Sequence, residues 1–319
     1  MRFAAIALAT LAAGPAASQP VLSLPIDCEL GETCHIQQYV DRDPGAGARD
    51  FLCHGLAYDG HKGTDFALPT LDKMHQGVNI LAAAPGVVTG VRDQMPDQYF
   101  NDETAAQVKG RECGNGLVLR HPDGWETQYC HMKRGSLQVR TGDRVKRGQV
   151  LGQVGLSGKT QFPHLHLSVR HNGEVIDPFD LSDRASCGAQ GAHIWQDKPD
   201  YVPGGLLAVG FSPNLPEYDA IKAGTAAHPE LEPDAPGLVV FGFMFGGRTG
   251  DTVEIDISGP QGFERRHEDQ IDRNRAQYFR AFGSRLRQER WPAGLYSGTV
   301  TIRRDGEVLD TMTTTTRIP

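Results

Sequence analysis

The sequence lacks a long apolar run beyond its first residues, a polybasic stretch and a Cys-x-x-Cys pair. Without a later run of about 20 apolar residues, we expect no integral membrane anchor. The formal net charge is −7 and residues of both signs are interspersed, which argues against nucleic-acid binding. Because close-set cysteine pairs are typical of cysteine-built zinc sites, their absence argues against such a site.

Helix-period patterns are also scarce, whereas the chain has 38 glycines and 20 prolines. Short apolar or alternating stretches separated by Gly, Pro, Asn and Asp are typical of strands joined by tight turns. The sequence therefore predicts an all-β protein. Its length allows two domains, each large enough to bury a core.

The first residues have the organisation of a secretory signal peptide. Arg2 precedes an apolar region from Phe3 to Ala13, and small residues follow up to Ser18. We predict a signal peptide over residues 1–18 and an exported protein, either periplasmic or secreted. No cysteine directly follows the apolar region, which argues against a lipoprotein anchor.

An even number of cysteines in an exported chain favours disulfide bonds. The six cysteines precede the last ~130 residues, so they would stabilise only one part of the molecule. Sequence leaves the connectivity open; our preferred pairing joins Cys28 to Cys34, Cys53 to Cys113, and Cys130 to Cys187.

The stretch 163–170 reads Pro-His-Leu-His-Leu-Ser-Val-Arg. Successive side chains of a strand point to opposite faces, so the apolar residues would face a core. His164, His166 and Ser168 would then project together from the other face. The alternative interpretation is a half-buried strand with two solvated histidines.

Two further segments bring histidines near this strand in the predicted organisation. His61 and Asp65 stand four residues apart around Gly63, which would let the backbone bend so that both side chains converge. Imidazole and carboxylate are suitable zinc ligands, although a turn with a side-chain hydrogen bond is the alternative. A predicted hairpin over residues 115–129 would deliver His131 just past its end.

Several short motifs occur in one order across residues 50–180, and together they resemble the lysostaphin-like, LytM-type zinc metallopeptidases of bacterial cell walls. They are His61-x-Gly63-x-Asp65, Ala84-Pro85-Gly86-Val87-Val88, Gly114-Asn115-Gly116, Tyr129-x-His131, Gly142-Asp143-x-Val145-x-x-Gly148-Gln149 and Pro163-His164-Leu165-His166. The resemblance implies a LytM-type antiparallel β-sheet domain.

The resemblance also implies residue roles. His61, Asp65 and His166 become the ligands of Zn²⁺, which leaves one coordination position for water, as in catalytic zinc sites. His131 and His164 become catalytic histidines, one accepting a proton from water and the other orienting or stabilising the carbonyl oxygen. We assign the base role to His131, although the two roles could be exchanged.

The implied function is an exported endopeptidase that hydrolyses peptidoglycan peptides, in the stem or the cross-bridge, with zinc-activated water. One alternative is a non-catalytic LytM-like scaffold that binds the cell wall or activates an amidase. Another is hydrolysis of a protein substrate, such as a glycine-rich chain, by the same site.

Two features depart from the family pattern, and the role of Tyr129 within it is open. Residues 92–113 form an insertion, which we interpret as a surface loop rather than as a groove wall that selects substrate. Phe162 is larger than the residue often found there and would narrow the approach to the site. Tyr129 could place its hydroxyl near the oxyanion or simply pack in the core.

The predicted organisation has five parts. They are the signal peptide, a disulfide-stapled N-terminal wrap over 19–50, the LytM-type peptidase domain over 51–181, a linker over 182–205, and an immunoglobulin-like β-sandwich domain over 206–319. Residues 264–269, which are all charged, are interpreted as a solvated turn. The sandwich contains no catalytic motif; it would bind wall polymer, bind a partner protein, or pack against the peptidase domain.

Overall fold

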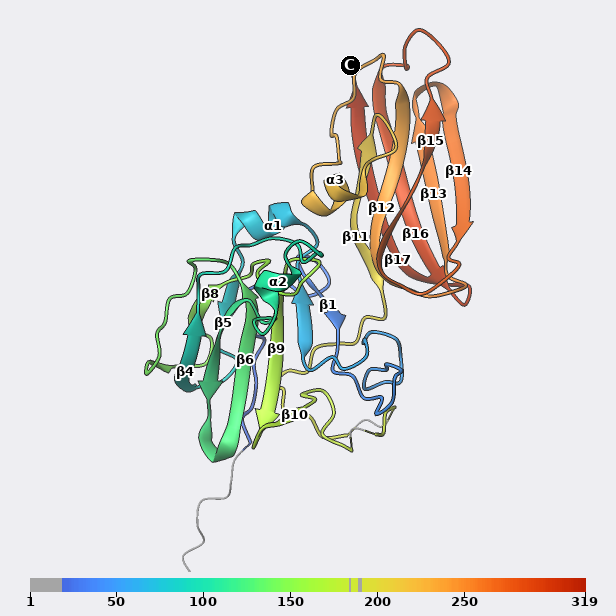
Figure 1. The fold of residues 1–319 in the computed structure, drawn as a ribbon. Helices are drawn as coiled ribbons and strands as arrows, with labels where there is room; N and C mark the ends of the chain where they lie inside the picture. Colours follow the sequence, from blue (N-terminus) through green and yellow to red (C-terminus); the bar gives the residue numbers. More distant parts are fainter. Residues whose placement is uncertain (1–18, 184, 189–190) are drawn as a thin grey trace, which may run out of the picture.

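The computed structural model describes residues 19–183, 185–188 and 191–319 (Figure 1). The predicted signal peptide over 1–18 lies outside these residues. The described elements are nearly all strands in antiparallel sheets, which confirms the all-β prediction. No helix within this part of the chain is long and apolar enough to cross a membrane.

An eight-stranded antiparallel sheet carries all of the predicted site segments. Its strand order is β1-β2-β9-β6-β5-β4-β7, and β10 pairs with β9. The strands are β1 (His35–Gln38), β2 (Thr64–Ala67), β4 (Gly86–Arg92), β5 (Asn115–Arg120), β6 (Trp125–Met132), β7 (Arg144–Val145), β9 (His164–His171) and β10 (Glu174–Ile176). Beside this sheet, β3 (Asn79–Leu81) pairs with β8 (Val150–Gln153); the short helices are α1 (Leu71–Gln76), α2 (Ala105–Val108) and the 3-10 turn η1 (Pro122–Gly124).

The alternation along β9 separates a core face from a histidine face. Leu165, Leu167 and Val169 are at most 1% exposed and belong to the largest apolar cluster among the described residues. Burial of three such side chains stabilises the strand by roughly 1.5–3 kcal/mol each. His164 and His166 consequently project from the opposite face, as predicted.

Three disulfide bonds join residues of the N-terminal half, and only one of them follows the preferred pairing. Cys28 pairs with Cys34 as expected, but Cys53 pairs with Cys187 and Cys113 with Cys130. The expected Cys53–Cys113 and Cys130–Cys187 bonds are therefore wrong. Cys113 and Cys130 approach because they lie at the ends of the segments that become β5 and β6, which are neighbours in the sheet.

The segment over 19–50 does more than wrap the surface, since it contributes β1 to the sheet. It is also held by Arg42, whose side chain is fully buried. The guanidinium forms an ion pair with Asp177 at 3.2 Å and donates to the carbonyl oxygens of Asp180 and Asp183, each at 2.7 Å. Arg42 thus joins this segment to the chain that follows β10.

The C-terminal half is a sandwich of two antiparallel sheets (Figure 1). Buried side chains from both sheets share one core, with Leu238 and Val240 packing in the same cluster as Ile255 and Val300. One sheet has the order β11-β12-β15 and the other β14-β13-β16-β17. Its elements are β11 (Gly205–Ser212), α3 (Tyr218–Ala223), β12 (Gly237–Gly247), β13 (Thr252–Gly259), η2 (Pro260–Gly262), β14 (Phe263–Gln270), β15 (Arg275–Arg285), β16 (Gly294–Arg304) and β17 (Glu307–Ile318).

Residues 264–269 are not the predicted charged turn, because they lie within β14. This strand pairs with β13 along its whole length and forms one edge of the four-stranded sheet. Its side chains are largely exposed, and Arg266 forms a cross-strand ion pair with Glu254 at 3.1 Å. A strand with few buried side chains shows little apolar alternation, which is why the pattern resembled a turn.

The sandwich contacts the eight-stranded sheet through β1. The Gln37 side chain donates to the carbonyl oxygen of Ala276 and accepts from the side-chain amide of Gln277; both distances are 2.9 Å. The rings of His35 and Phe245 also meet, with centroids 4.4 Å apart. Packing against the sheet was one of the three roles considered for the sandwich.

Candidate metal centre

Two neighbouring strands bring the predicted metal ligands together. Asp65 on β2 lies directly opposite His166 on β9, so the two side chains project from the same face of the sheet. His61 lies in the turn that leads into β2, where its backbone amide donates to the carbonyl oxygen of Tyr58. The three residues form the group that could hold a metal ion, with ligand atoms within 4.8 Å of one another.

The separations between these ligand atoms suit a small cation. Asp65 Oδ1 lies 2.7 Å from His166 Nδ1 and 3.2 Å from His61 Nε2, and the two nitrogens are 3.1 Å apart. Zinc bonds of about 2.0–2.2 Å in a tetrahedron would separate the ligand atoms by roughly 3.3 Å. The donor set therefore fits zinc with only small adjustments.

Hydrogen bonds on the outer ring nitrogens orient both histidines. His61 Nδ1 lies 2.6 Å from the carbonyl oxygen of Tyr39, to which it can only donate. His166 Nε2 lies 2.9 Å from Ser168 Oγ. Donation from His61 Nδ1 leaves the lone pair of a neutral His61 ring on Nε2, and donation from His166 Nε2 to Ser168 would do the same for His166 Nδ1; a cation between the two nitrogens would stabilise this arrangement.

The charge of Asp65 is maintained although the carboxylate is buried. Burial acts to raise its pKa, but His61 and His164 outweigh this effect and hold the pKa well below its usual value. Burial conversely lowers the pKa of His166, against the opposing influence of Asp65. An anionic carboxylate beside a neutral imidazole is the protonation pattern that a divalent cation requires.

Gly63 is required by close packing. A Cβ at this position would lie 2.6 Å from His166 Nε2 and 2.6 Å from the carbonyl oxygen of Leu167. Its φ is outside the left-handed range, so the backbone bend expected from the sequence is not the reason for glycine here.

His131 reaches the histidine face through a bulge in β6. Regular alternation would put it on the same face as Tyr129, which is buried in the core. Instead, Cys130 and His131 oppose the single residue Gly116 on β5, and His131 has a φ of 61°. Its ring centroid consequently lies 4.6 Å from that of His164.

The position of His131 is held from several sides. Its backbone amide donates to the carbonyl oxygen of Cys113 at 2.8 Å, beside the Cys113–Cys130 disulfide. Its Nδ1 lies 2.7 Å from the carbonyl oxygen of Ser157, so it must donate and Nε2 keeps a lone pair. Burial, together with the neighbouring His164 and His166, lowers the pKa of His131 well below its usual value.

His164 lies between the ligand cluster and an aromatic ring. Its Nδ1 is 2.9 Å from the carbonyl oxygen of Phe162, and its Nε2 is 3.5 Å from Asp65 Oδ1. The ring of Phe162 stacks on it with centroids 4.4 Å apart. Phe162 therefore covers one side of His164, in keeping with the expected narrowing of the approach.

The centre is recessed. His61, Asp65, His131 and His164 are all buried, whereas the His166 side chain is 15% exposed. Solvent consequently reaches the cluster mainly at His166.

The insertion over 92–113, interpreted as a surface loop, is mostly exposed and also packs on the loop that leads into β9. Asp97 accepts from the backbone amide of Leu156 at 2.8 Å, and Phe100 donates its amide to the carbonyl oxygen of Thr160 at 2.9 Å. Met95 and Val108 are buried. The insertion thus supports the segment from which His164 and Phe162 emerge.

Tyr129 is a packing residue, since its hydroxyl accepts from the backbone amide of Ala83 at 2.9 Å inside the core. Sequence reasoning did not anticipate the carbonyl oxygens of Tyr39 and Ser157, because backbone acceptors leave no residue signature. Ser168 was placed on the histidine face but without a role. Tyr58, whose ring lies 4.4 Å from that of His61, was not singled out either.

Comparison with known proteins finds a described family that matches the segment carrying this centre. Residues 59–178 match the family described as Peptidase family M23. The match includes all five residues of the centre and confirms the resemblance found in the sequence.

Individual relatives agree with this match. The chain is 32% identical over 124 residues to the DD-carboxypeptidase/endopeptidase Mpg of Neisseria meningitidis, covering 38% of this chain and 23% of the relative. It is 34% identical over 118 residues to the peptidoglycan DD-endopeptidase ShyC of Vibrio cholerae, covering 37% and 22%. The chain thus spans less than a quarter of the length of these curated relatives.

Among solved structures, the catalytic domain of the prophage-encoded M23 protein EnpA from Enterococcus faecalis is 29% identical. The likeness covers 44% of this chain and 88% of that domain, with a TM-score of 0.30.

Proposed function

We propose that this chain is an exported, zinc-dependent endopeptidase that hydrolyses peptide bonds of bacterial peptidoglycan, in the stem or the cross-bridge. The observation that carries the proposal is the convergence of His61, Asp65 and His166 on one point, with two further histidines beside them. The named activities of the M23 relatives support the substrate class. The three disulfide bonds and the signal-like first residues support export.

In this proposal, His61, Asp65 and His166 hold the zinc ion. When bound, zinc supplies a Lewis acid that lowers the pKa of water and polarises a carbonyl group. The carboxylate offsets part of the metal charge, and the two imidazoles are fixed by Tyr39 and Ser168. Such outer hydrogen bonds contribute roughly 10–100-fold to metal affinity in known sites.

His131 and His164 perform the proton chemistry. The Nε2 lone pair of His131 accepts a proton from the attacking water and returns it to the leaving amine. His164 donates from Nε2 to the carbonyl oxygen of the scissile bond, where negative charge develops.

Single substitutions separate the proposed metal-binding and proton-transfer roles. Asp65→Ala and His166→Ala should abolish both zinc retention and hydrolysis, because each removes a metal ligand. His131→Ala should keep about one zinc per chain and lose at least roughly 100-fold in rate, since a general base typically contributes 10²–10⁴-fold. His75→Ala, on the exposed face of α1, is the matched control.

Zinc content would be measured by plasma mass spectrometry and hydrolysis by the release of soluble fragments from purified peptidoglycan. Mass analysis of the fragments identifies the bond cleaved and separates wall peptides from a protein substrate. Full activity of Asp65→Ala would refute the ligand assignment. Zinc binding by the unaltered protein without cleavage of any wall would favour the scaffold alternative.

A further inference from the structure

A groove lies where the sandwich meets the eight-stranded sheet. It has a volume of about 400 Å³. Gln38 and Tyr58 line it from the peptidase side, while Arg248 and Arg275 line it from the sandwich. The groove therefore exists only because the two parts of the chain lie together.

One wall of the groove adjoins the metal centre. Gln38 is the β1 residue directly opposite Asp65 on β2. The ring of Tyr58 lies 4.4 Å from the ring of His61, and Tyr58 itself is 54% exposed. A molecule bound in the groove would consequently lie next to two of the proposed zinc ligands.

The opposite wall presents positive charge without matching acceptors. Arg248 Nη2 and Arg275 Nε are buried atoms, and neither has a hydrogen-bond partner. Arg275 reaches Asp272 through a different nitrogen, Nη2, at 3.2 Å, whereas Arg248 forms no ion pair with any carboxylate of the described residues. The two arginines in the lining therefore bring positive charge to the groove with only one carboxylate, that of Asp272, to offset it, so a ligand that supplies oxygen atoms would be stabilised here.

The groove is held in shape by contacts that do not involve the two arginines. Gln37, the neighbour of Gln38, bonds to the carbonyl oxygen of Ala276 and to the amide of Gln277. These bonds fix the start of β15, where Arg275 lies, against the edge of the peptidase sheet. A site formed by both parts is therefore preorganised for a ligand.

We propose that this groove binds a free carboxylate of the peptide substrate, so that the sandwich supplies part of the substrate site. The inference rests on the proposed hydrolytic function and adds to it a preference for substrates with a carboxylate near the scissile bond. Carboxylate is the ligand chosen because a planar guanidinium matches its two oxygens and because peptides carry such groups at their free ends and acidic side chains.

The test compares arginine variants on charged and neutralised substrate. The probe is a cross-linked peptide dimer released from purified peptidoglycan, used intact or after its free carboxyl groups are converted to amides. The protein is the full chain carrying His131→Ala, so that binding is measured by calorimetry without turnover. Into it we introduce Arg248→Gln or Arg275→Gln, with Arg285→Gln at the other end of β15 as the matched control.

We expect Arg248→Gln and Arg275→Gln each to weaken binding of the intact dimer roughly tenfold or more, as for a lost charge-assisted hydrogen bond. The protein that keeps both arginines should bind the amidated dimer about as weakly as the glutamine variants bind the intact dimer. Affinity for the amidated dimer should fall little further in those variants. Arg285→Gln should change neither value. Thermal melting checks the fold; if a glutamine variant does not fold, Arg275→Lys and Arg248→Lys, which keep the charge, should bind the intact dimer more tightly than the amidated one.

Equal affinity for the intact and amidated dimers, or equal losses in the groove variants and Arg285→Gln, would overturn the inference. Hydrolysis is scored separately with His131 restored. Cleavage with arginine-independent binding refutes the groove and leaves the hydrolase proposal standing. Arginine-dependent binding without cleavage refutes the hydrolase proposal and retains the carboxylate site.

Discussion

Replacing Gly63 with alanine tests how tightly the metal centre is packed. The added Cβ would lie 2.6 Å from His166 Nε2 and from the carbonyl oxygen of Leu167, whereas ordinary contacts begin at 3.4 Å. Both contacts must therefore lengthen by about 0.8 Å. The carbonyl belongs to a paired strand, so we expect the imidazole of His166 to move further than the backbone, and the backbone shift to add to the cost in stability.

Metal–ligand distances tolerate deviations of only about 0.2 Å, so a shift of this size should impair the ligand. We expect zinc affinity to fall roughly 10–100-fold, comparable to loss of an orienting contact, with an overpacking cost of about 1–3 kcal/mol in unfolding free energy. Competition with a chromogenic chelator measures the affinity, and urea unfolding measures the stability.

Gly90→Ala is the matched control, because a Cβ at Gly90 on β4 meets no atom within 4 Å and its φ is not left-handed. It should leave zinc affinity and stability nearly unchanged. Wild-type zinc affinity in Gly63→Ala would show that the His166 ring does not need the space above this glycine, and the packing argument would fail.

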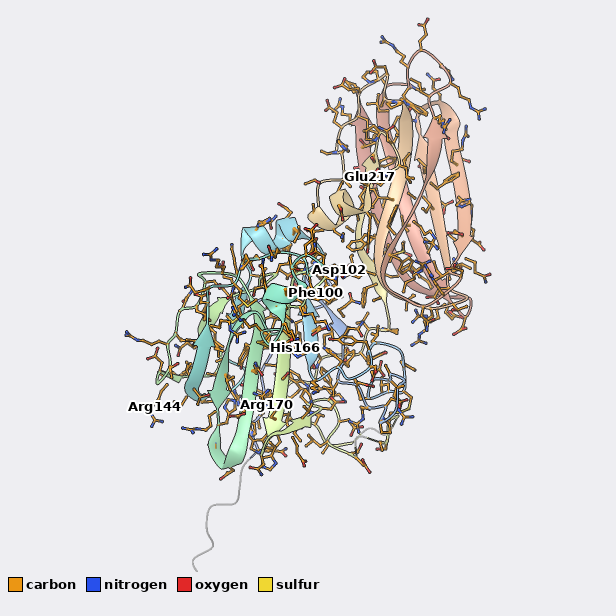
Figure 2. All side chains as sticks on the ribbon, viewed as in Figure 1. Phe100, Asp102, Arg144, His166, Arg170 and Glu217 are labelled. Carbon is orange, nitrogen blue, oxygen red and sulfur yellow. A yellow bond between two sulfur atoms is a disulfide. The ribbon has the colours of Figure 1, made fainter. Side chains whose placement is uncertain are left out.

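Two further predictions concern stability. Arg42→Ala should lower the unfolding free energy by about 3–5 kcal/mol, because it leaves a buried carboxylate and several carbonyl oxygens unpaired. The control is Arg144→Ala on β7, where the exposed side chain should tolerate the change (Figure 2). Equal urea midpoints for the two variants would contradict this. Burial lowers the pKa of His35 to about 4, while the unfolded residue binds a proton near 6.5, so protons favour unfolding. Stability should therefore fall by up to about 3 kcal/mol as the pH drops from 6.5 towards 4, and this slope should be smaller in His35→Gln; an unchanged slope would exclude His35 as its source.

Local patterns predicted the parts of the fold that depend on neighbouring residues. Alternation in the 163–170 stretch placed His164 and His166 on one face, because strand geometry has a period of two. The same rule is wrong for His131, which it would place with Tyr129 in the core. A bulge opposite Gly116 turns the His131 side chain to the opposite face of the sheet. Nothing in the local sequence marks the φ of 61° that this bulge requires at His131.

Long-range partners could not be read from the sequence. The Cys53–Cys187 bond depends on how the chain returns after β10, and spacing alone did not indicate it. Contacts such as Gln37 with Gln277 join residues of the two halves and involve no distinctive residue type. The carboxylate groove therefore became visible only when both halves were placed together.

The Cys53–Cys187 bond also closes the chain into a covalent ring that contains every residue of the proposed catalytic centre, from His61 to His166. A protease that cuts one surface loop within this ring would open it without separating the two fragments, because the disulfide still joins them. Dissociation would need a second cut or a reductant. Under the proposed function, this tether would prolong activity after the first cleavage.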